Sequence, residues 1–169
     1  DERQALQKMN RWPCETQAIS AACWDGRLIR IRLSGSQSGI EHARSYIGGE
    51  YIDGIGYWQN LNNFNLDFFK QAGRLWRVSL APMSESIGID STQLIDWGGS
   101  QRWLKSDEPP EIIRSRAVQL GGHAECFSDD PAVATYQPLD GVLLTVNRRF
   151  KDAFDPAGIL NPGRLQPEF

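Results

Sequence analysis

Alternation of apolar and polar residues with the period of a β-strand is the feature that most limits how this chain can fold. Trp76, Val78 and Leu80 alternate with two polar residues, and Pro82 ends the pattern. A second alternating stretch, 28–33, is separated from residues 19–24 by an Asp-Gly pair, the dipeptide typical of a tight hairpin. Both stretches predict strands with one buried face and one face in water.

Helical patterns are interspersed with these strands. The predicted helices cover residues 2–12 (stopped by Pro13), 36–47, 57–69, 109–120 and 142–154, and the further predicted strands cover residues 50–52, 94–97, 101–104 and 123–127. Hairpins mixed with helices predict an α+β fold, an antiparallel sheet with helices packed on one face. The two halves have similar element orders, which is compatible with duplicated ferredoxin-like units, although no sequence repeat supports a duplication.

Composition is typical of one globular domain. The 169 residues are 40% hydrophobic and 23% charged, and the net charge of −3 argues against a nucleic-acid partner. The three cysteines are too few for a disulfide framework and indicate reduced thiols of a cytoplasmic protein. No apolar run is long enough for a transmembrane segment. The chain starts at Asp1 within a helical pattern, from which we expect a fragment of a longer protein.

The run FDPAGILNPGR at residues 154–164 combines a helix end, stopped by Pro156, with a tight Asn-Pro-Gly turn. It resembles the C-terminal motif of FAD-linked oxidases of the vanillyl-alcohol oxidase type. The segments LWRVSLAP (75–82), LIDWGGSQRWL (94–104) and GGHA (121–124) resemble the FAD-binding subunit of bacterial glycolate oxidase. The similarity covers residues from about 10 to 169, and the Asp-Trp-Gly-Gly hairpin is its most particular part.

The resemblance implies that residues 1–169 form the C-terminal cap, or substrate, domain of such an oxidase. Its N-terminal FAD-binding domain is absent from this chain, so FAD would be bound mainly outside it and no cofactor is expected in this fragment alone. The implied reaction is oxidation of glycolate to glyoxylate. The implied partners are a flavin-containing catalytic subunit and an iron-sulfur subunit, through which the protein could lie peripherally on the inner face of the cell membrane. The glycine-rich stretch 35–39 lacks dinucleotide spacing and predicts only a helix start.

Three residues are candidates for the site. His123 follows a Gly-Gly turn and could handle the proton of a 2-hydroxy acid or donate to a flavin carbonyl, while a hydrogen-bonded structural histidine explains it about equally well. Asn161 and Arg164 are held just beyond the last helix and, by the resemblance, face the flavin together with His123. No metal site is expected, because His42 and His123 are too scattered to share one ion.

Other polar and aromatic residues have simpler explanations. Arg102 could bind a carboxylate, but an ion pair with Asp96 that pins the hairpin is the commoner role. Trp76, Trp97 and Trp103 are expected to serve in the core or an interface, with stacking on a flavin a secondary possibility. Two other functions stay open, namely a non-catalytic assembly or electron-relay module, and a subunit of an oxidase for another 2-hydroxy acid such as lactate.

Overall fold

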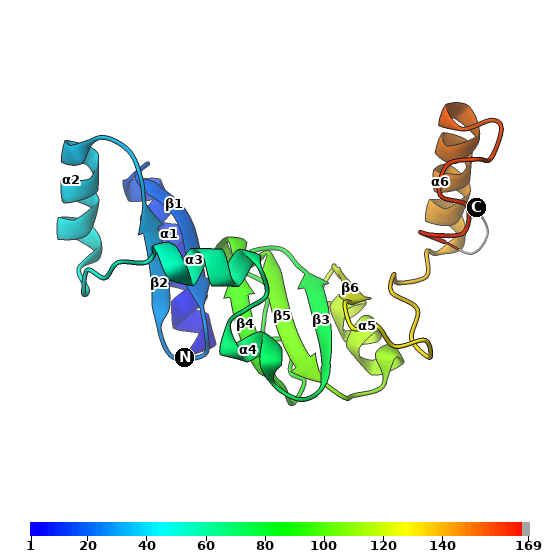
Figure 1. Cartoon of the computed structure of the whole chain (residues 1–169), viewed down its shortest axis with the longest axis horizontal. Helices are drawn as coiled ribbons and strands as arrows, with labels where there is room; N and C mark the ends of the chain where they lie inside the picture. Colours follow the sequence, from blue (N-terminus) through cyan, green and yellow to red (C-terminus); the bar gives the residue numbers. More distant parts are fainter. Residues whose placement is uncertain (167–169) are drawn as a thin grey trace.

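Six strands form one antiparallel sheet in the order β2-β1-β4-β5-β3-β6 (Figure 1). The structure is a computed structural model, and it describes residues 1–166. The elements in chain order are α1 (Glu2–Glu15), β1 (Ile19–Trp24), β2 (Ile29–Leu33), α2 (Gln37–Ile47), α3 (Ile55–Asn62), α4 (Asp67–Lys70), β3 (Arg74–Ser79), β4 (Thr92–Asp96), the 3₁₀ turn η1 (Trp97–Gly99), β5 (Gln101–Ser106), α5 (Pro110–Gln119), β6 (His123–Cys126) and α6 (Gly141–Phe154). The α+β class and the antiparallel sheet are therefore confirmed.

Helices cover both faces of the sheet, so the expectation of helices on one face only was wrong. Helices α1 and α5 pack on one face, against Ile95 and Leu104 respectively. Helices α3 and α4 lie on the other face, where Leu61 packs with Leu94 and Trp103. Successive strand residues point to opposite faces, and the neighbours Leu94 and Ile95 both find apolar helix partners, which makes β4 a strand buried on both sides.

The hairpin β1–β2 forms as its Asp-Gly pair predicts, but its arginine face is partly covered by α3. The Arg30 guanidinium lies 4.6 Å from the ring centre of Tyr57, and that of Arg32 lies 5.6 Å from Trp58, both on α3. Arginine can lie flat on an aromatic ring, so alternation with arginine does not by itself define a wet face.

Two expected helices have different limits. α1 continues through Pro13 to Glu15, because the amide of Thr16 still bonds to the carbonyl of Trp12 and only the bond from position 13 is lost. The predicted helix 57–69 is broken into α3 and α4, with Phe64 at the break in a left-handed conformation (φ 57°).

The predicted strand at residues 50–52 does not form, and the ferredoxin-like duplication is not confirmed. The C-terminal half does contain a crossover, β5-α5-β6, whose two strands flank β3 and run antiparallel to it. In the N-terminal half, α2 stands away from the sheet (Figure 1), so the segment after it has no strand to pair with.

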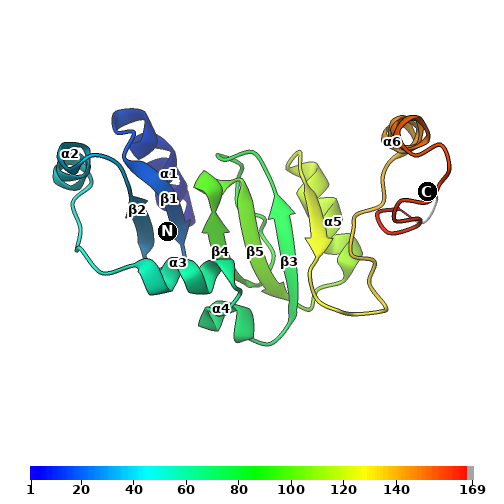
Figure 2. The same cartoon turned by 45° about the horizontal axis from the view of Figure 1, so that its top comes forward.

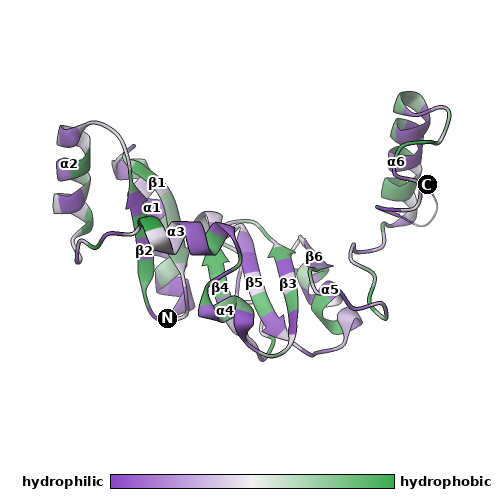
Figure 3. Cartoon of the chain, viewed as in Figure 1, coloured by the Kyte–Doolittle hydropathy of each residue, from purple (hydrophilic) through white to green (hydrophobic). Residues whose placement is uncertain are grey.

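Helices α2 and α6 stand off the two ends of the sheet, as both views show (Figures 1 and 2). Helix α2 buries Ala43 alone, and no residue of α6 is buried. Yet α6 carries a full set of apolar residues, visible as the green side of the helix in Figure 3. Its exposed apolar residues are Val142, Leu143, Val146, Phe150 and Phe154. The apolar edge predicted from the sequence therefore exists, but nothing within residues 1–166 covers it.

Candidate functional site

The sheet face that carries α3 also carries a row of polar side chains across four strands. The register pairs Asp96 of β4 with Gln101 of β5, Gln101 with Ser79 of β3, and Ser79 with His123 of β6. Directly paired residues in a sheet lie on the same face, so these four side chains form one line. With strands about 4.8 Å apart, the line from Asp96 to His123 is roughly 14 Å long. It ends at an exposed histidine.

Gly122 explains how His123 reaches this position. A Cβ atom on Gly122 would lie 1.9 Å from the carbonyl oxygen of Ser79 and 2.6 Å from Leu80 Cδ2, so a side chain there cannot fit. Gly121 before it has φ +78° and bends the chain back from α5. The close approach lets β6 pair with β3 from its first residue, His123, whose imidazole makes no hydrogen bond to any of residues 1–166.

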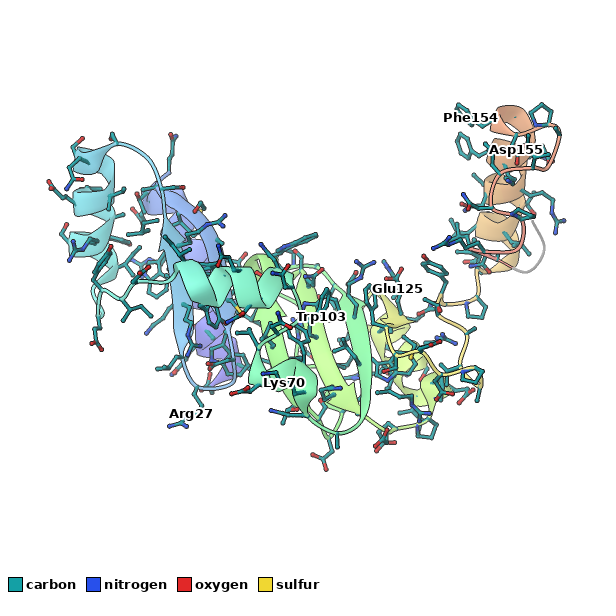
Figure 4. The ribbon with its side chains drawn as sticks, in the orientation of Figure 1. Arg27, Lys70, Trp103, Glu125, Phe154 and Asp155 are labelled. Atoms are coloured by element: carbon teal, nitrogen blue, oxygen red, sulfur yellow. The ribbon has the colours of Figure 1, made fainter. Side chains whose placement is uncertain are left out.

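Below His123 on the same face, Arg77 and Glu125 form an ion pair. Both Nε and Nη2 of Arg77 donate to Glu125 Oε2, the first at 2.9 Å. The guanidinium also lies 4.9 Å from the ring centre of Phe127, which packs edge-on against Trp103. Figure 4 shows Glu125 beside β6 and Trp103 over the middle of the sheet. The guanidinium of Arg77 is therefore occupied by Glu125 and Phe127. Of the three residues His123, Arg77 and Glu125, His123 alone has no hydrogen-bond partner among residues 1–166.

The motif after α6 folds into an arm organised by Asp155. Its carboxylate accepts from the amides of Ile159 (3.1 Å) and Leu160 (2.8 Å) and from the ammonium of Lys151, which also donates to the Leu160 carbonyl. These bonds, first the one from Lys151, lower the pKa of Asp155 to about 2. Beside it Phe154 is 83% exposed and projects from the tip of α6 (Figure 4). Asp155 is thus the anchor of the arm, a role that the sequence pattern did not single out.

Asn161 and Arg164 lie on this arm and are exposed, joined by a turn in which the Arg164 amide bonds to the Asn161 carbonyl at 3.2 Å. Asn161 has φ +46°, which an asparagine tolerates better than most residues. The structure does not bring them to His123: no hydrogen bond joins the arm to β6 within the described part of the chain. Their proposed common role as flavin contacts stays a prediction.

The expected Asp96–Arg102 ion pair does not form, because the two side chains point to opposite faces of the sheet. Arg102 is fully buried beneath α1, where Nη1 donates to Glu2 Oε1 at 2.9 Å. Its other donors hold the carbonyls of Ser84, Glu85 and Gly99. Arg102 is therefore a structural tie.

Two of the three tryptophans are core residues as expected: Trp76 is fully buried and Trp103 is 5% exposed. Trp97 differs, because it lies in η1 and is 69% exposed. His42 is exposed on α2. Within residues 1–166, no group of three or more His, Cys, Asp or Glu side chains could hold a metal ion, and no helix is long and apolar enough to cross a membrane.

Comparison with known proteins finds similarity to one family of flavin enzymes. The model of the family "FAD linked oxidases, C-terminal domain" matches residues 134–165, the arm and the segment that leads to it. The chain is also similar to glycolate oxidase subunit GlcE of Escherichia coli (strain K12), with 36% identity over 166 residues, 98% of this chain and 47% of that protein. The chain thus spans about half the length of this relative, and no solved structure matches it.

The similarity to FAD-linked oxidases implies FAD as cofactor. The only glycine-rich candidate for a diphosphate loop in the described residues is the start of α2, where Ser36 Oγ already accepts from the amide of Gly39 (3.2 Å). Within residues 1–166, that start of α2 is therefore not free to hold a diphosphate. The residues present fit FAD that is bound mainly outside this chain.

Proposed function

We propose that this chain is the part of an FAD-dependent glycolate oxidase subunit that closes over the flavin and completes the substrate site. The observation that carries the proposal is the exposed imidazole of His123, which has no hydrogen-bond partner among residues 1–166 and ends a polar row on the sheet face that carries α3. The similarity to a glycolate oxidase subunit supports the choice of substrate. FAD, when bound, accepts the hydride that leaves the substrate carbon.

In this proposal His123 accepts the hydroxyl proton of glycolate as the carbon–hydrogen bond breaks. An imidazole that has no hydrogen-bond partner among residues 1–166 can accept that proton and later release it to water. Ser79, its cross-strand neighbour, supplies a hydroxyl that can donate to or accept from the substrate. Asn161 and Arg164 are proposed to contact the flavin from the arm.

The assembled enzyme would include the flavin-containing and iron-sulfur subunits inferred from the resemblance, and electrons would leave through the latter. We also propose that the rest of the chain holds no metal ion. Its surface would dock to those subunits at the inner face of the membrane. The isolated chain is expected to be inactive.

The test replaces His123 by Ala in the assembled, flavin-loaded complex, with His42→Ala as the matched control on exposed helix α2. We expect glycolate-dependent dye reduction to fall by roughly 10²–10⁴-fold for His123→Ala at unchanged flavin content, the range for loss of a general base. His42→Ala should retain full activity. Unchanged activity of the His123 variant would exclude the catalytic role.

The uncovered apolar side of α6 favours a second function, a non-catalytic assembly module. That function predicts the reverse result: substitution of Phe150 and Phe154 by serine prevents assembly, while His123→Ala leaves turnover intact. Turnover with glycolate, lactate and longer 2-hydroxy acids then identifies the substrate, because the polar row offers no pocket that measures chain length.

A further inference from the structure

The elbow between β4 and β5 holds Trp97 in a conformation that costs energy. Trp97 has φ +50°, and the next two residues, Gly98 and Gly99, have φ +65° and +103°. Glycine adopts such angles without strain, whereas a bulky residue is strained by them. The indole gains no compensating burial, since the residue is 69% exposed. The core of the protein therefore does not explain a tryptophan at this position.

The elbow is nevertheless held firmly in place. The Asp96 carboxylate accepts from the Trp97 amide at 2.7 Å, and Asn10 of α1 donates to the Gly98 carbonyl at 2.7 Å. Arg102 donates to the Gly99 carbonyl at 3.3 Å, and Gly99 packs so closely that a Cβ would lie 2.3 Å from the Pro82 oxygen. Strained residues fixed from several sides in this way are concentrated at ligand sites.

A cavity of about 360 Å³ lies beside the elbow, within the usual range for small-molecule sites. It exists because β1 pairs with β4 only at Cys23 and Trp24. The first half of β1 therefore continues past the end of β4 with no strand paired to it on that side. A register shift between Ile19 and Ala21 marks a bulge in the same place. Bulges are frequent next to functional sites. We call this space the elbow cavity, lined by Trp58, Trp97, Met9, Arg32, Asn62 and Asp96 among others.

Two groups of opposite charge, Asp96 and Arg32, line the cavity, and each can form further hydrogen bonds. Asp96 is 8% exposed, and within residues 1–166 its carboxylate has one hydrogen-bond donor, the amide of Trp97, which leaves the second oxygen to the cavity. Burial raises the pKa of Asp96 above its usual value, partly offset by that amide and by Arg32. Arg32 donates from Nε and Nη2 to Ser20, and its Nη1 has no partner in the described chain. A buried carboxylate with a free oxygen is stabilised by a ligand that donates to it.

We propose that the elbow cavity binds a small α-substituted carboxylic acid. The ligand carboxylate pairs with Arg32, an α-hydroxyl or α-ammonium group donates to Asp96, and an apolar side chain lies against the indoles of Trp97 and Trp58. Arginine with aspartate matches the two polar ends of such a molecule, and exposed aromatic rings match its apolar part. The cavity lies at the opposite end of the polar row from His123, so this site is independent of the proposed oxidation of glycolate.

The test is calorimetric titration of the full chain with three probes of one shape: phenyllactate, phenylalanine and 3-phenylpropionate. We expect phenyllactate, phenylalanine or both to bind at least tenfold more tightly than 3-phenylpropionate, which lacks the α-donor. The preferred member of the pair identifies the α-group. Equal binding of all three probes, or binding of none, overturns the proposal.

Variants then locate the site. Trp97→Gly removes the indole and also relieves the left-handed strain, so it should unfold at an equal or higher urea concentration while binding falls at least tenfold. Asp96→Asn and Arg32→Gln should weaken binding similarly. Tyr51→Ala, at a residue 73% exposed on a distant loop, is the control and should bind normally. A Trp97→Gly chain that is folded and binds the preferred probe as well as the parent contradicts the proposal.

Discussion

Substitution of Gly122 by alanine tests whether the turn before His123 is built as described. The new Cβ would start 1.9 Å from the Ser79 carbonyl oxygen, and real Cβ atoms essentially never come closer than 3.0 Å, so β6 and β3 must separate by about 1.1 Å. Leu80 can rotate away, but the Ser79 oxygen belongs to the backbone of β3, which is paired with β5 and β6 on its two sides, and cannot. Overpacking of this kind costs about 1–3 kcal/mol, and the weakened pairing of β6 adds to it. We expect a loss of about 3 kcal/mol in the free energy of unfolding.

Gly121→Ala is the matched control one residue away. Gly121 has φ +78° with nothing within 4 Å of a Cβ, so alanine there meets strain but no collision. That strain is about 1–2 kcal/mol and is reduced by the lower entropy of the unfolded chain. In thermal unfolding followed by circular dichroism, at about 2–4 °C per kcal/mol for a chain of this size, Gly122→Ala should lower Tm by about 6–12 °C and Gly121→Ala by only a few degrees. A Gly122→Ala protein as stable as the Gly121→Ala protein would refute the close approach.

Three further outcomes follow from the arm and the thiols. The pKa of Asp155 is lowered to about 2 in the folded arm, against about 3.9 in an unfolded chain, so its stabilisation is complete above pH 4 and lost as the pH falls toward 2. The protection of the Ile159 and Leu160 amides from exchange, measured against the unfolded chain at the same pH, should therefore fall over that window and should not change with pH in Asp155→Asn. Cys14 is exposed and should react at once with a thiol reagent, whereas Cys23, whose pKa burial raises to about 12, should react only when the protein unfolds, as mass spectrometry can follow. Phe154→Ser, at a residue 83% exposed, should leave Tm of the chain within about 1–2 °C, since nothing in residues 1–166 covers that ring; a larger fall would mean that α6 packs against the sheet.

The strands were predictable because their signals are local. The Asp-Gly pair and the alternation at residues 76–80 depend only on neighbouring residues, and both features form as expected. The strand at 50–52 had a similar local pattern but no neighbouring strand within reach, and a strand exists only when another pairs with it. Local patterns thus predicted most of the helices and strands. That helices cover both faces of the sheet could not be predicted, because it depends on which helices pack back against the sheet.

The residues of the candidate site were likewise only partly predictable from the sequence. His123 was found because a Gly-Gly pair next to a histidine is visible in the sequence, but its cross-strand partner Ser79 depends on register and could not be read from it. Asp96 and Arg102 are six residues apart and were expected to pair. Residues an even number apart share a face only within one strand, and the turn η1 lies between these two, so their side chains point to opposite faces of the sheet. A glutamate at position 2, a hundred residues away, takes the arginine instead.

The arm combines internal order with an absence of burial, and this combination constrains its role. Asp155 satisfies two backbone amides and Lys151, so the turn after α6 is fixed before anything contacts it. The side chains that this fixed turn presents, from Phe150 and Phe154 to Ile159, are apolar and exposed. A surface that is ordered in advance avoids the entropy of ordering when a partner covers it, which is the property expected of a closing element.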